Sequence, residues 1–503
     1  MPNYRSLNEA LKETCREASG RFHKSTKNVQ KVQGEKLAQI VQDNSKTDFG
    51  KNYYLNKIKS VSDFRSAVPI TRYEDYEDYV TQIADGGQQI LTRDKVLMLE
   101  PTSGSTSPSK FIPYTESLKQ EFQAGIFPWL YDLLQNRPSI KKGSFYWSIT
   151  PVAHNQEITA GGIPMGFGDD GIYFTLEQQK IIAQLSAVPF DVAQIQDIDE
   201  FRDRTLSYLV KNKDLSFISV WNPTFLSLLL RPIDSPNEVW PNLSLISSWA
   251  DGNASSYIGD IQRLFPDAEI QGKGLIATEG FVSFPLVGYE GSALSINSHF
   301  FEFMDVENEK DIRLAHEVEK GREYETILTT GGGFYRYNLE DIVKVVGFRD
   351  QCPLIRFVGR NNNVSDLFGE KLNEYHVSGV VNETLQSYSI TPSFYMVAPT
   401  KIEDQSILSY TLFIESSNDL MNPQDIVDSL DARLQENFHY KYCRKLGQLG
   451  RPRIFLIKSD KEKTATDIYL KESQVKGKKI GNVKPAMLDS SMCWSEKFNG
   501  NFI

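Results

Sequence analysis

Residues 269–280 read Glu-Ile-Gln-Gly-Lys-Gly-Leu-Ile-Ala-Thr-Glu-Gly, a strand-like run that leads into a small polar turn. Upstream, strand-like runs at 144–149, 216–221 and 244–249 alternate with helical runs at 176–185, 198–211, 223–230 and 256–264. Strands that alternate with helices predict an α/β fold in layers. Because such folds bind ligands beyond the carboxyl ends of their strands, the carboxylate of Glu279 is a candidate site group.

The length of 503 residues predicts two or three domains, and the composition is that of a globular protein. A different pattern begins after Arg360, with helical runs at 377–385 and 423–437 and strand-like runs at 393–397, 408–415 and 453–457. This pattern is typical of a compact α+β unit. We therefore expect a large α/β domain over residues 1–365 and a smaller α+β domain over 366–503, with a hinge near 360–371.

The charge balance argues against broad binding to nucleic acid. Lys and Arg number 55 against 65 Asp and Glu, which gives a net charge of −10, whereas a phosphate backbone requires a basic face. One segment departs from this average, because residues 441–484 hold 13 Lys and Arg against 4 acidic residues. This basic segment is either a solvated face or a surface for an anionic ligand.

The sequence also argues against a secreted or membrane-spanning protein. The four cysteines, at positions 15, 352, 443 and 493, are scattered and form no CxxC pair. The most apolar stretch, 215–230, is interrupted by Asn222 and Pro223 and is too short to span a bilayer. No signal peptide is visible near the N-terminus, so we expect a cytoplasmic protein with reduced thiols.

The strongest local signal is Thr-Ser-Gly-Ser-Thr-Ser-Pro-Ser-Lys at 102–110, which follows a short strand-like run. Its hydroxyl and backbone N–H groups can surround phosphate oxygens, its glycine allows close approach of the backbone, and Lys110 adds a positive charge. The stretch therefore predicts a phosphate-binding loop. A flexible surface loop rich in Ser and Thr explains the composition alone equally well.

Two further stretches place acidic side chains beside glycines. In 272–280, the Glu279 carboxylate offers the hard oxygens that Mg²⁺ prefers, although a helix cap or a surface turn would use the same residues. In Gly-Gly-Gly-Phe-Tyr-Arg-Tyr-Asn-Leu-Glu-Asp at 331–341, the Asp341 carboxylate can accept hydrogen bonds from both hydroxyls of a ribose. The alternative there is a glycine-rich hairpin with a structural Asp.

A fourth stretch comprises Phe-Val-Gly-Arg at 357–360 and Asp-Leu-Phe-Gly-Glu-Lys-Leu-Asn-Glu at 366–374. Glycine, Arg360 and Lys371 at a domain boundary suit a hinge that carries charge toward a ligand. An ordinary linker would have a similar composition.

The order of these four stretches resembles that of the acyl-adenylate-forming superfamily. More narrowly, it resembles the auxin-responsive (Gretchen Hagen) family of acyl acid–amido synthetases and their bacterial relatives. The resemblance runs from about Phe64 to Leu488 and includes the stretches at 68–75 and 249–252. It implies a mobile C-terminal domain and an enzyme that uses ATP to convert a carboxylic acid into an acyl-adenylate, releasing pyrophosphate. An amine, usually that of an amino acid, then takes the acyl group, and AMP leaves.

The resemblance also implies roles for individual residues. It implies a nucleotide site formed by Ser103, Gly104, Ser105, Thr106, Ser107, Thr278, Tyr335, Asp341 and Arg360. It implies Mg²⁺ binding by Glu279, and catalytic roles for Lys110, Lys371, Lys484 and Glu279. Mg²⁺ and a lysine delivered by domain closure would stabilise the negative charge that develops on the phosphate oxygens. The basic segment 441–484 would then close over the nucleotide.

Several positions depart from the plant members of that family. The loop at 102–110 is one residue shorter, and Leu275 stands where the plant proteins have an aromatic residue. Asn338 and Glu340 replace an Arg and a Gly, which adds a negative charge beside Asp341. These changes indicate a distant or bacterial branch.

The acyl pocket is the part that the sequence determines least. Residues around 146–167 and 221–230, including Trp147, His154 and Trp221, suit a hydrophobic or aryl acid, although each is explained equally well as core. No general base stands out among His154, His299 and His316.

Three functions remain open on the sequence. The first is an amido synthetase that uses ATP, Mg²⁺, a small carboxylic acid and an amine. The second is a ligase that passes the acyl group to a thiol such as coenzyme A. The third is a nucleotide-binding protein without turnover, for which the changes at Leu275 and Glu340 are the best support. No oligomeric state follows from the sequence.

Overall fold

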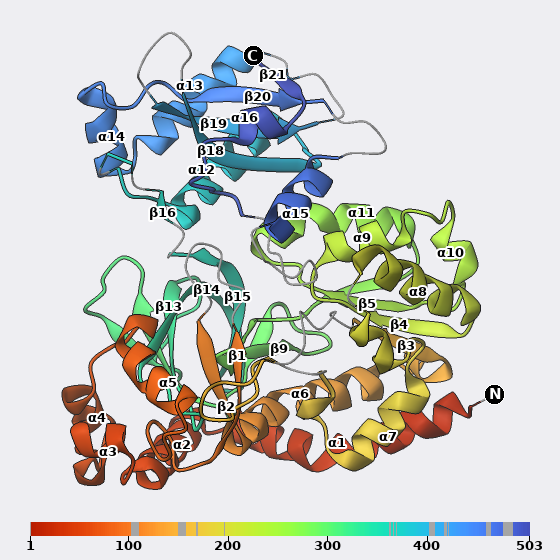
Figure 1. The fold of residues 1–503 in the computed structure, drawn as a ribbon, viewed down its shortest axis with the longest axis vertical. Coiled ribbons are helices and arrows are strands. Elements are labelled where there is room, and N and C mark those ends of the chain that lie inside the picture. Colours follow the sequence, from red (N-terminus) through yellow and green to blue (C-terminus); the bar gives the residue numbers. More distant parts are fainter. Residues whose placement is uncertain are drawn as a thin grey trace. The chain divides into compact units, whose positions relative to one another are not determined.

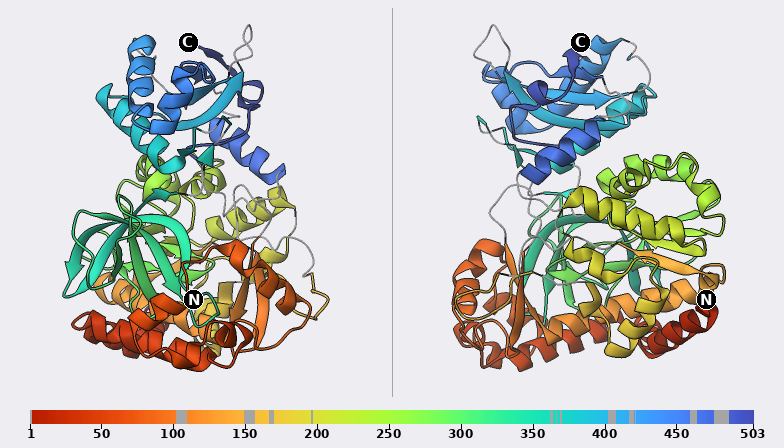
Figure 2. Two further views of the ribbon diagram at one scale, coloured as in Figure 1. Left: turned by 90° about the vertical axis from the view of Figure 1, so that its left-hand side faces the viewer. Right: turned by 45° about the vertical axis from the view of Figure 1, so that its right-hand side comes forward.

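The structure is a computed structural model that describes residues 2–101, 110–148, 157–166, 170–195, 197–361, 364–365, 367–368, 370–401, 408–416, 420, 422–458, 464–475 and 486–503. The chain divides into two compact units (Figure 1, Figure 2). Unit 1 comprises Met1–Asp251 and Asp260–Phe357, and unit 2 comprises Gly252–Gly259 and Val358–Ile503. Along the chain, unit 1 ends at Phe357, a few residues before the domain boundary that the sequence predicts. That predicted boundary stays a prediction.

A four-stranded parallel sheet in unit 1 accounts for the alternating pattern of the sequence. Its strands, in spatial order, are β3 (Ser144–Trp147), β4 (Leu215–Ser219), β5 (Leu245–Ser248) and β6 (Glu269–Gly272). The helices between them are α7 (Leu176–Leu185), α8 (Ile198–Lys211), α9 (Pro223–Leu230), α10 (Pro236–Val239) and α11 (Ile258–Leu264). Polar side chains of Thr175, Asp197 and Asn222 cap the N-termini of α7, α8 and α9. The predicted α/β class is confirmed.

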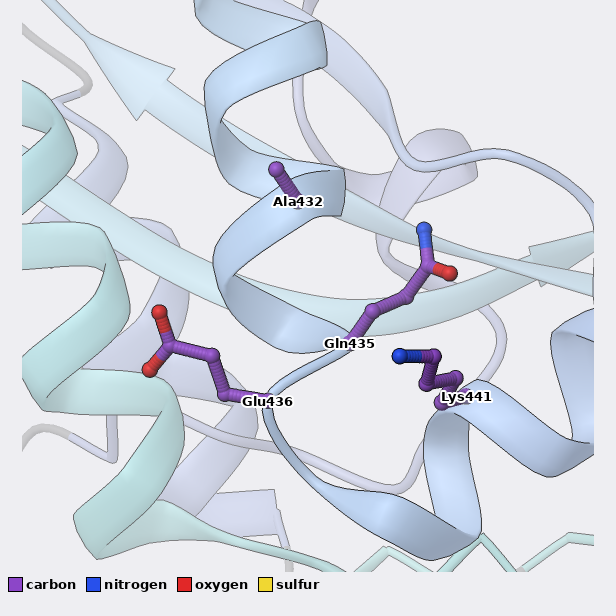
Figure 3. Close-up of a pocket in the computed structure, with 4 residues that line it drawn as sticks. All are labelled: Ala432, Gln435, Glu436 and Lys441. Atoms are coloured by element: carbon purple, nitrogen blue, oxygen red, sulfur yellow. The ribbon is translucent and has the colours of Figure 1, made fainter.

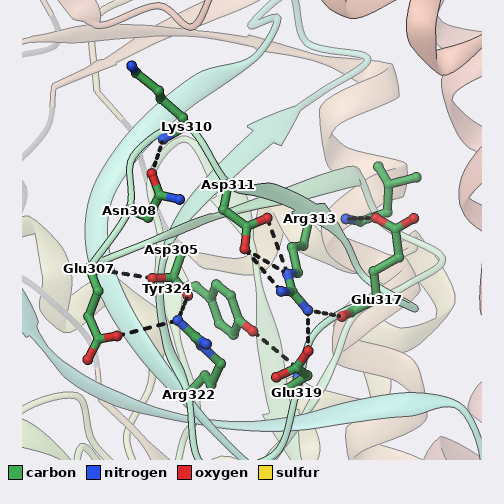
Figure 4. Close-up of polar contacts among 11 residues, drawn as sticks. Asp305, Glu307, Asn308, Lys310, Asp311, Arg313, Glu317, Glu319, Arg322 and Tyr324 are labelled. Carbon is green, nitrogen blue, oxygen red and sulfur yellow. Dashed lines mark hydrogen bonds and ion pairs between the residues drawn. The ribbon is translucent and has the colours of Figure 1, made fainter.

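A seven-stranded sheet forms the second sheet layer of unit 1. Its order is β12 (Ile312–Leu314), β11 (Phe300–Asp305), β13 (Glu323–Thr329), β14 (Tyr337–Arg349), β15 (Cys352–Arg360), β10 (Ser292–Leu294) and β9 (Ser283–Pro285). At its β12 edge, Arg313 binds Asp311 and Glu319, and Arg322 binds Asp305 with Nη2 2.7 Å from Oδ2 (Figure 4). Such charges protect an edge strand from pairing with another chain.

Helices and two hairpins complete unit 1. The helices are α1 (Tyr4–Ser25), α2 (Val29–Asn44), α3 (Asp48–Asn52), α4 (Val61–Ala67), α5 (Glu77–Ala84) and α6 (Glu116–Asn136). The hairpins are β1 (Val96–Pro101) with β2 (Phe111–Thr115), and β7 (Ile276–Ala277) with β8 (Gly280–Phe281). Helix α6 packs against α1 on one side and against β8 and β9 on another, so it lies at the centre of the unit.

Unit 2 has the α+β composition predicted for the C-terminal part. Its sheet runs β18 (Phe394–Lys401), β19 (Leu408–Glu415), β20 (Arg453–Ile457) and β21 (Gly500–Phe502). Its helices are α12 (Glu374–Ser387), α13 (Pro423–Leu434), α14 (Phe438–Lys445), α15 (Ala465–Val475) and α16 (Trp494–Lys497). A short ribbon of β16 (Val364–Ser365) and β17 (Leu372–Asn373) precedes α12. Within the described residues of both units, no helix combines the length and apolarity that crossing a bilayer requires.

Burial predicts a single fast-reacting thiol in the folded protein. Burial raises the pKa of Cys15 to about 12, and it also raises the pKa of Cys352. Cys443 is buried as well, whereas Cys493 is half-buried. With 5,5′-dithiobis(2-nitrobenzoate) at pH 8, we expect Cys493 to react at least about 100-fold faster than the other three, because the thiolate is the reactive form. Two or more fast thiols in the native protein would contradict this burial pattern.

Candidate active site

The turn Thr278–Glu279 joins β7 to β8, shortly after the carboxyl end of β6. Both side chains are half-buried. The hydroxyl of Tyr337, the first residue of β14, donates to Oε1 of Glu279 across 3.5 Å. The second and third stretches of the sequence analysis therefore meet at this turn.

Lys110 lies immediately before β2, with its Nζ 5.5 Å from the centroid of the Tyr73 ring. The Tyr73 hydroxyl accepts a hydrogen bond of 2.7 Å from the backbone N–H of Phe111, which holds the start of β2. Burial raises the pKa of Tyr73, and the negative charge of Glu279 adds to that increase. Lys110 thus lies over the ring of Tyr73, and the charge of Glu279 acts on the hydroxyl of the same residue.

The side chains that begin the 335–341 stretch build the core. The ring of Tyr335 is fully buried and stacks on Phe49 with centroids 4.3 Å apart, and its hydroxyl donates to the Leu91 carbonyl across 2.6 Å. Arg336 is buried and forms two hydrogen bonds to the Glu302 carboxylate. In a nucleotide site, the buried Tyr335 side chain would therefore act by fixing the backbone that leads to Asp341.

Asp341 lies in a β-bulge and is fully buried. The register between β13 and β14 shifts there, because Ile327 faces Asn338 while Glu325 faces Ile342. Inside the bulge, Glu340 has a φ of 59°, in the left-handed region. Its carboxylate lies 3.3 Å from Nε of Arg72. The negative charge that Glu340 adds to the motif is thus partly balanced by Arg72.

A buried pair, Glu121 of α6 and His299, links the turn at Glu279 to the glycine run at 331–333. The exposed fractions are 5% for Glu121 and 0% for His299. The N–H of Phe281 donates to Nε2 of His299 across 2.9 Å. Nδ1 must therefore carry the ring proton, and it donates to Oε2 of Glu121 across 3.1 Å. The N–H of Gly331 donates to the same carboxylate at 2.9 Å.

Two glycines of the motifs pack directly on this pair. A Cβ on Gly280 would come within 2.9 Å of Nε2 of His299. A Cβ on Gly331 would come within 3.0 Å of Oε1 of Glu121. Glycine at these two positions therefore allows the backbone to approach the buried pair. The sequence analysis missed Glu121, because its spacing in α6 resembles that of any helical residue, and it left His299 without a role.

The predicted residues of unit 2 lie at its start. Arg360 ends β15 and is half-buried, and Lys371 is exposed with a φ of 43°. The preceding Glu370 is fully buried and accepts hydrogen bonds from the N–H groups of Leu367 and Phe368. It also accepts one from the Tyr410 hydroxyl, whose pKa is raised first by burial and then by this bond. The fold thus anchors Glu370 and exposes Lys371 beside it.

Other predicted residues divide into two groups. Ser103, Gly104, Ser105, Thr106, Ser107, His154 and Lys484 lie outside the described residues. Trp147 ends β3, Trp221 follows β4, and both rings are half-buried, whereas Leu275 is buried in the core of unit 1. In the basic segment, Lys441 lines a small pocket with Ala432, Gln435 and Glu436 (Figure 3). The lining thus includes one acidic and one basic residue.

The residues at the turn fit a bound Mg²⁺ in one specific way. Among the described residues, no group of three or more His, Cys, Asp or Glu side chains could hold a metal ion. Mg²⁺ commonly binds through one or two carboxylates together with substrate phosphates and water. A single carboxylate, that of Glu279, suits this mode and does not suit a site made by the protein alone.

Comparisons with known proteins agree with one another. Profiles of the GH3 family N-terminal, central and C-terminal domains match residues 18–237, 292–360 and 375–490. The jasmonoyl–L-amino acid synthetase JAR6 of Nicotiana attenuata is 23% identical, over 87% of this chain and 88% of that protein. A solved structure titled AtGH3.15 acyl acid amido synthetase in complex with 2,4-DB matches with a TM-score of 0.79 and 17% identity, over 97% of this chain and 96% of that one.

A 2-hydroxyisobutyryl-CoA ligase in the postadenylation state matches more distantly, with a TM-score of 0.53 and 12% identity over 88% of this chain and 91% of that one. The predicted fold of acyl-adenylate-forming type is thereby confirmed.

The link through His299 predicts a specific stability pattern. His299→Leu leaves the Phe281 N–H without its acceptor and removes one donor from the buried Glu121 carboxylate. We expect a loss of about 2–4 kcal/mol in the free energy of unfolding. His299→Gln can place an amide oxygen near the position of Nε2, and we expect it to recover roughly half of that loss.

Urea unfolding followed by tryptophan fluorescence measures this effect, because five of the six tryptophans lie in unit 1. His316→Leu is the matched control, since His316 is half-buried near β12, outside the link, and we expect a change within about 0.5 kcal/mol. Equal losses in the two leucine variants would show that the link carries no special stability.

Proposed function

Because the chain belongs to the GH3 family, we propose that it is an ATP-dependent acyl acid amido synthetase with an amino acid as acceptor. A carboxylate oxygen of the acid attacks the α-phosphorus of ATP, and the bond to the pyrophosphate oxygen breaks. The amine nitrogen of the acceptor then attacks the acyl carbon of the adenylate. The bond to the AMP oxygen breaks, and the amine gives up a proton. The products are an amide, AMP and pyrophosphate.

One observation carries this proposal: within unit 1, residues from separated stretches of the chain are linked through Tyr73 and Glu279. Lys110 lies over the ring of Tyr73, the charge of Glu279 acts on the Tyr73 hydroxyl, and Tyr337 of the 331–341 stretch donates to Glu279. Charged and hydroxyl groups from three parts of the chain therefore lie together beyond a parallel sheet, where α/β folds take their ligands.

In the first step, we assign different parts of ATP to different residues. We assign the phosphates to the loop 102–110 with Lys110, the adenylate to Thr278 and the ribose hydroxyls to Asp341. Mg²⁺ held by Glu279 would supply positive charge at the phosphate oxygens. Fixed charges aimed at oxygens that become more negative account for most of the acceleration in such transfers. Arg360, Lys371 and Lys484 would contribute from the C-terminal domain.

The acceptor is assigned from the family and not from the fold. The fold is also similar to that of a 2-hydroxyisobutyryl-CoA ligase, so the fold does not distinguish an amine acceptor from a thiol acceptor. The relatives named above are amino acid or acyl acid amido synthetases, and this supports an amine. The four free thiols support action in the cytoplasm, where cysteines stay reduced.

Pyrophosphate release tests the activity. We expect release from ATP and Mg²⁺ that requires a carboxylic acid, chosen from aryl, indolyl and fatty acids. Pooled amino acids should increase the release and give an amide detectable by mass, whereas coenzyme A should give no thioester. A thioester would favour the ligase alternative. ATP binding without release across the panel would favour a nucleotide-binding protein without turnover.

Two carboxylate substitutions test the site. Glu279→Gln and Asp341→Asn keep the side-chain shape and remove the charge, so each should lower acid-dependent pyrophosphate release at least about 100-fold. Glu309→Gln, on the exposed β11–β12 connection, should leave release unchanged. Thermal unfolding should confirm that all three variants are folded. Normal rates in both site variants would show that the nucleotide site lies elsewhere.

A further inference from the structure

Lys273 directly follows β6, and its ammonium group is enclosed by aromatic rings. Only 6% of the residue is exposed. Nζ donates a hydrogen bond of 2.7 Å to the hydroxyl of Ser219, the last residue of β4. It lies 5.0 Å from the ring centroid of Trp221, 5.5 Å from that of Trp129 and 5.9 Å from that of Trp147.

The three tryptophans come from separate elements that converge on this point. Trp147 ends β3, and Trp221 follows the end of β4. Trp129 belongs to α6, and its indole N–H donates to the Gln271 side chain in β6 across 3.2 Å. The backbone N–H of Lys273 bonds to the carbonyl of Ser248, which ends β5. Every strand of the parallel sheet therefore contributes to the surroundings of Lys273.

This arrangement stabilises a positive charge in an apolar place. The face of an indole ring attracts a cation within about 6 Å, and the attraction grows when water is excluded. Burying an ammonium group is costly unless such partners offset its lost hydration. The half-buried rings of Trp147 and Trp221 give the cluster an apolar surface beside the charge. A cation with apolar neighbours is complementary to a small organic acid.

The cluster is separate from the nucleotide residues. Trp129 lies eight residues after Glu121 on α6, which corresponds to about 12 Å along the helix axis. Glu121 contacts the glycine run at Gly331, whereas Trp129 contacts Lys273. The first half of α6 thus lies beside the motifs assigned to the nucleotide, and its second half lies beside the Lys273 cluster. A ligand at the cluster would therefore lie beside the nucleotide site and not within it.

We propose that Lys273 binds the carboxylate of an organic substrate whose apolar part lies against Trp147 and Trp221. This inference rests on the proposed function, because that reaction has two substrates with a carboxylate. One is the acid that is activated, and the other is the amino acid acceptor. The ammonium group supplies the attraction for the carboxylate, and the indole rings supply the apolar contact. Lys273 is accordingly a determinant of substrate specificity.

The experiment compares Lys273→Met with Lys273→Arg. Methionine fills the aromatic enclosure without a charge, and arginine keeps the charge. Lys142→Met, at an exposed position before β3, is the matched control. The first assay is acid-dependent exchange of labelled pyrophosphate into ATP without any amino acid. The second is amide formation at saturating acid with the amino acid varied.

If the carboxylate is that of the acid, Lys273→Met should raise the KM for acid in the exchange assay by about 10- to 100-fold. If it is that of the acceptor, exchange should stay normal and the KM for the amino acid should rise by the same factor. Lys273→Arg should restore most of the affected KM, and Lys142→Met should change neither. Normal KM values for both substrates in a folded Lys273→Met protein would overturn the proposal, even if its stability falls.

Tryptophan fluorescence gives a readout that needs no turnover. Benzoate should quench the wild-type protein and Lys142→Met saturably, and Lys273→Met about 10-fold more weakly. Benzyl alcohol, which lacks the carboxylate, should not distinguish the variants. If the wild type shows no acid-dependent exchange, the proposed function fails, and charge-dependent quenching by benzoate still supports a carboxylate site. If Lys273→Met does not fold, Lys273→Gln replaces it in both arms.

Discussion

The buried carboxylate of Glu121 joins three segments of unit 1 through hydrogen bonds. Glu121 accepts hydrogen bonds from the ring of His299 and from the backbone of Gly331, and His299 in turn accepts from the backbone of Phe281. Because Nε2 of His299 accepts from Phe281, the ring proton lies on Nδ1 and points to Glu121. These two hydrogen bonds fix the orientation of the His299 ring. The turn at Glu279 and the glycine run are therefore fixed relative to each other.

Helix α6 connects these hydrogen bonds at Glu121 to the surroundings of Lys273. Its first half holds the Glu121 carboxylate, and its second half holds Trp129 against β6 and Lys273. The same helix packs on α1, so its position is set from outside as well as from within. A rigid helix between two groups of polar residues fixes their separation without any direct bond between them. In the proposed reaction, that separation would be the distance between a bound carboxylate and the nucleotide.

The sequence predicted the parallel sheet well and the second sheet poorly. Helices α7, α8 and α9 have the predicted limits, because caps at Thr175, Asp197 and Asn222 mark their starts. The seven-stranded sheet is built from consecutive strands between residues 283 and 360, but their order in the sheet departs from their order in the chain, and no local pattern specifies it. The assignment of Tyr335 to the nucleotide stays a prediction, and the stacking of its buried ring on Phe49 is a tertiary contact that the motif did not indicate. Glu121 and Lys273 were missed because their importance comes from tertiary neighbours that a single sequence does not show.

The bulge at Glu340 has a consequence for how such proteins are found by sequence. A residue other than glycine in the left-handed conformation lowers the free energy of unfolding by roughly 1–2 kcal/mol. An exposed ion pair offsets at most about 1 kcal/mol of this loss. Glu340 keeps the left-handed conformation and directs its carboxylate to Arg72, so the bulge around Asp341 is retained without the glycine. Searches that demand glycine at this position would discard chains whose backbone still has the required shape. The left-handed angle in this bulge therefore does not depend on glycine.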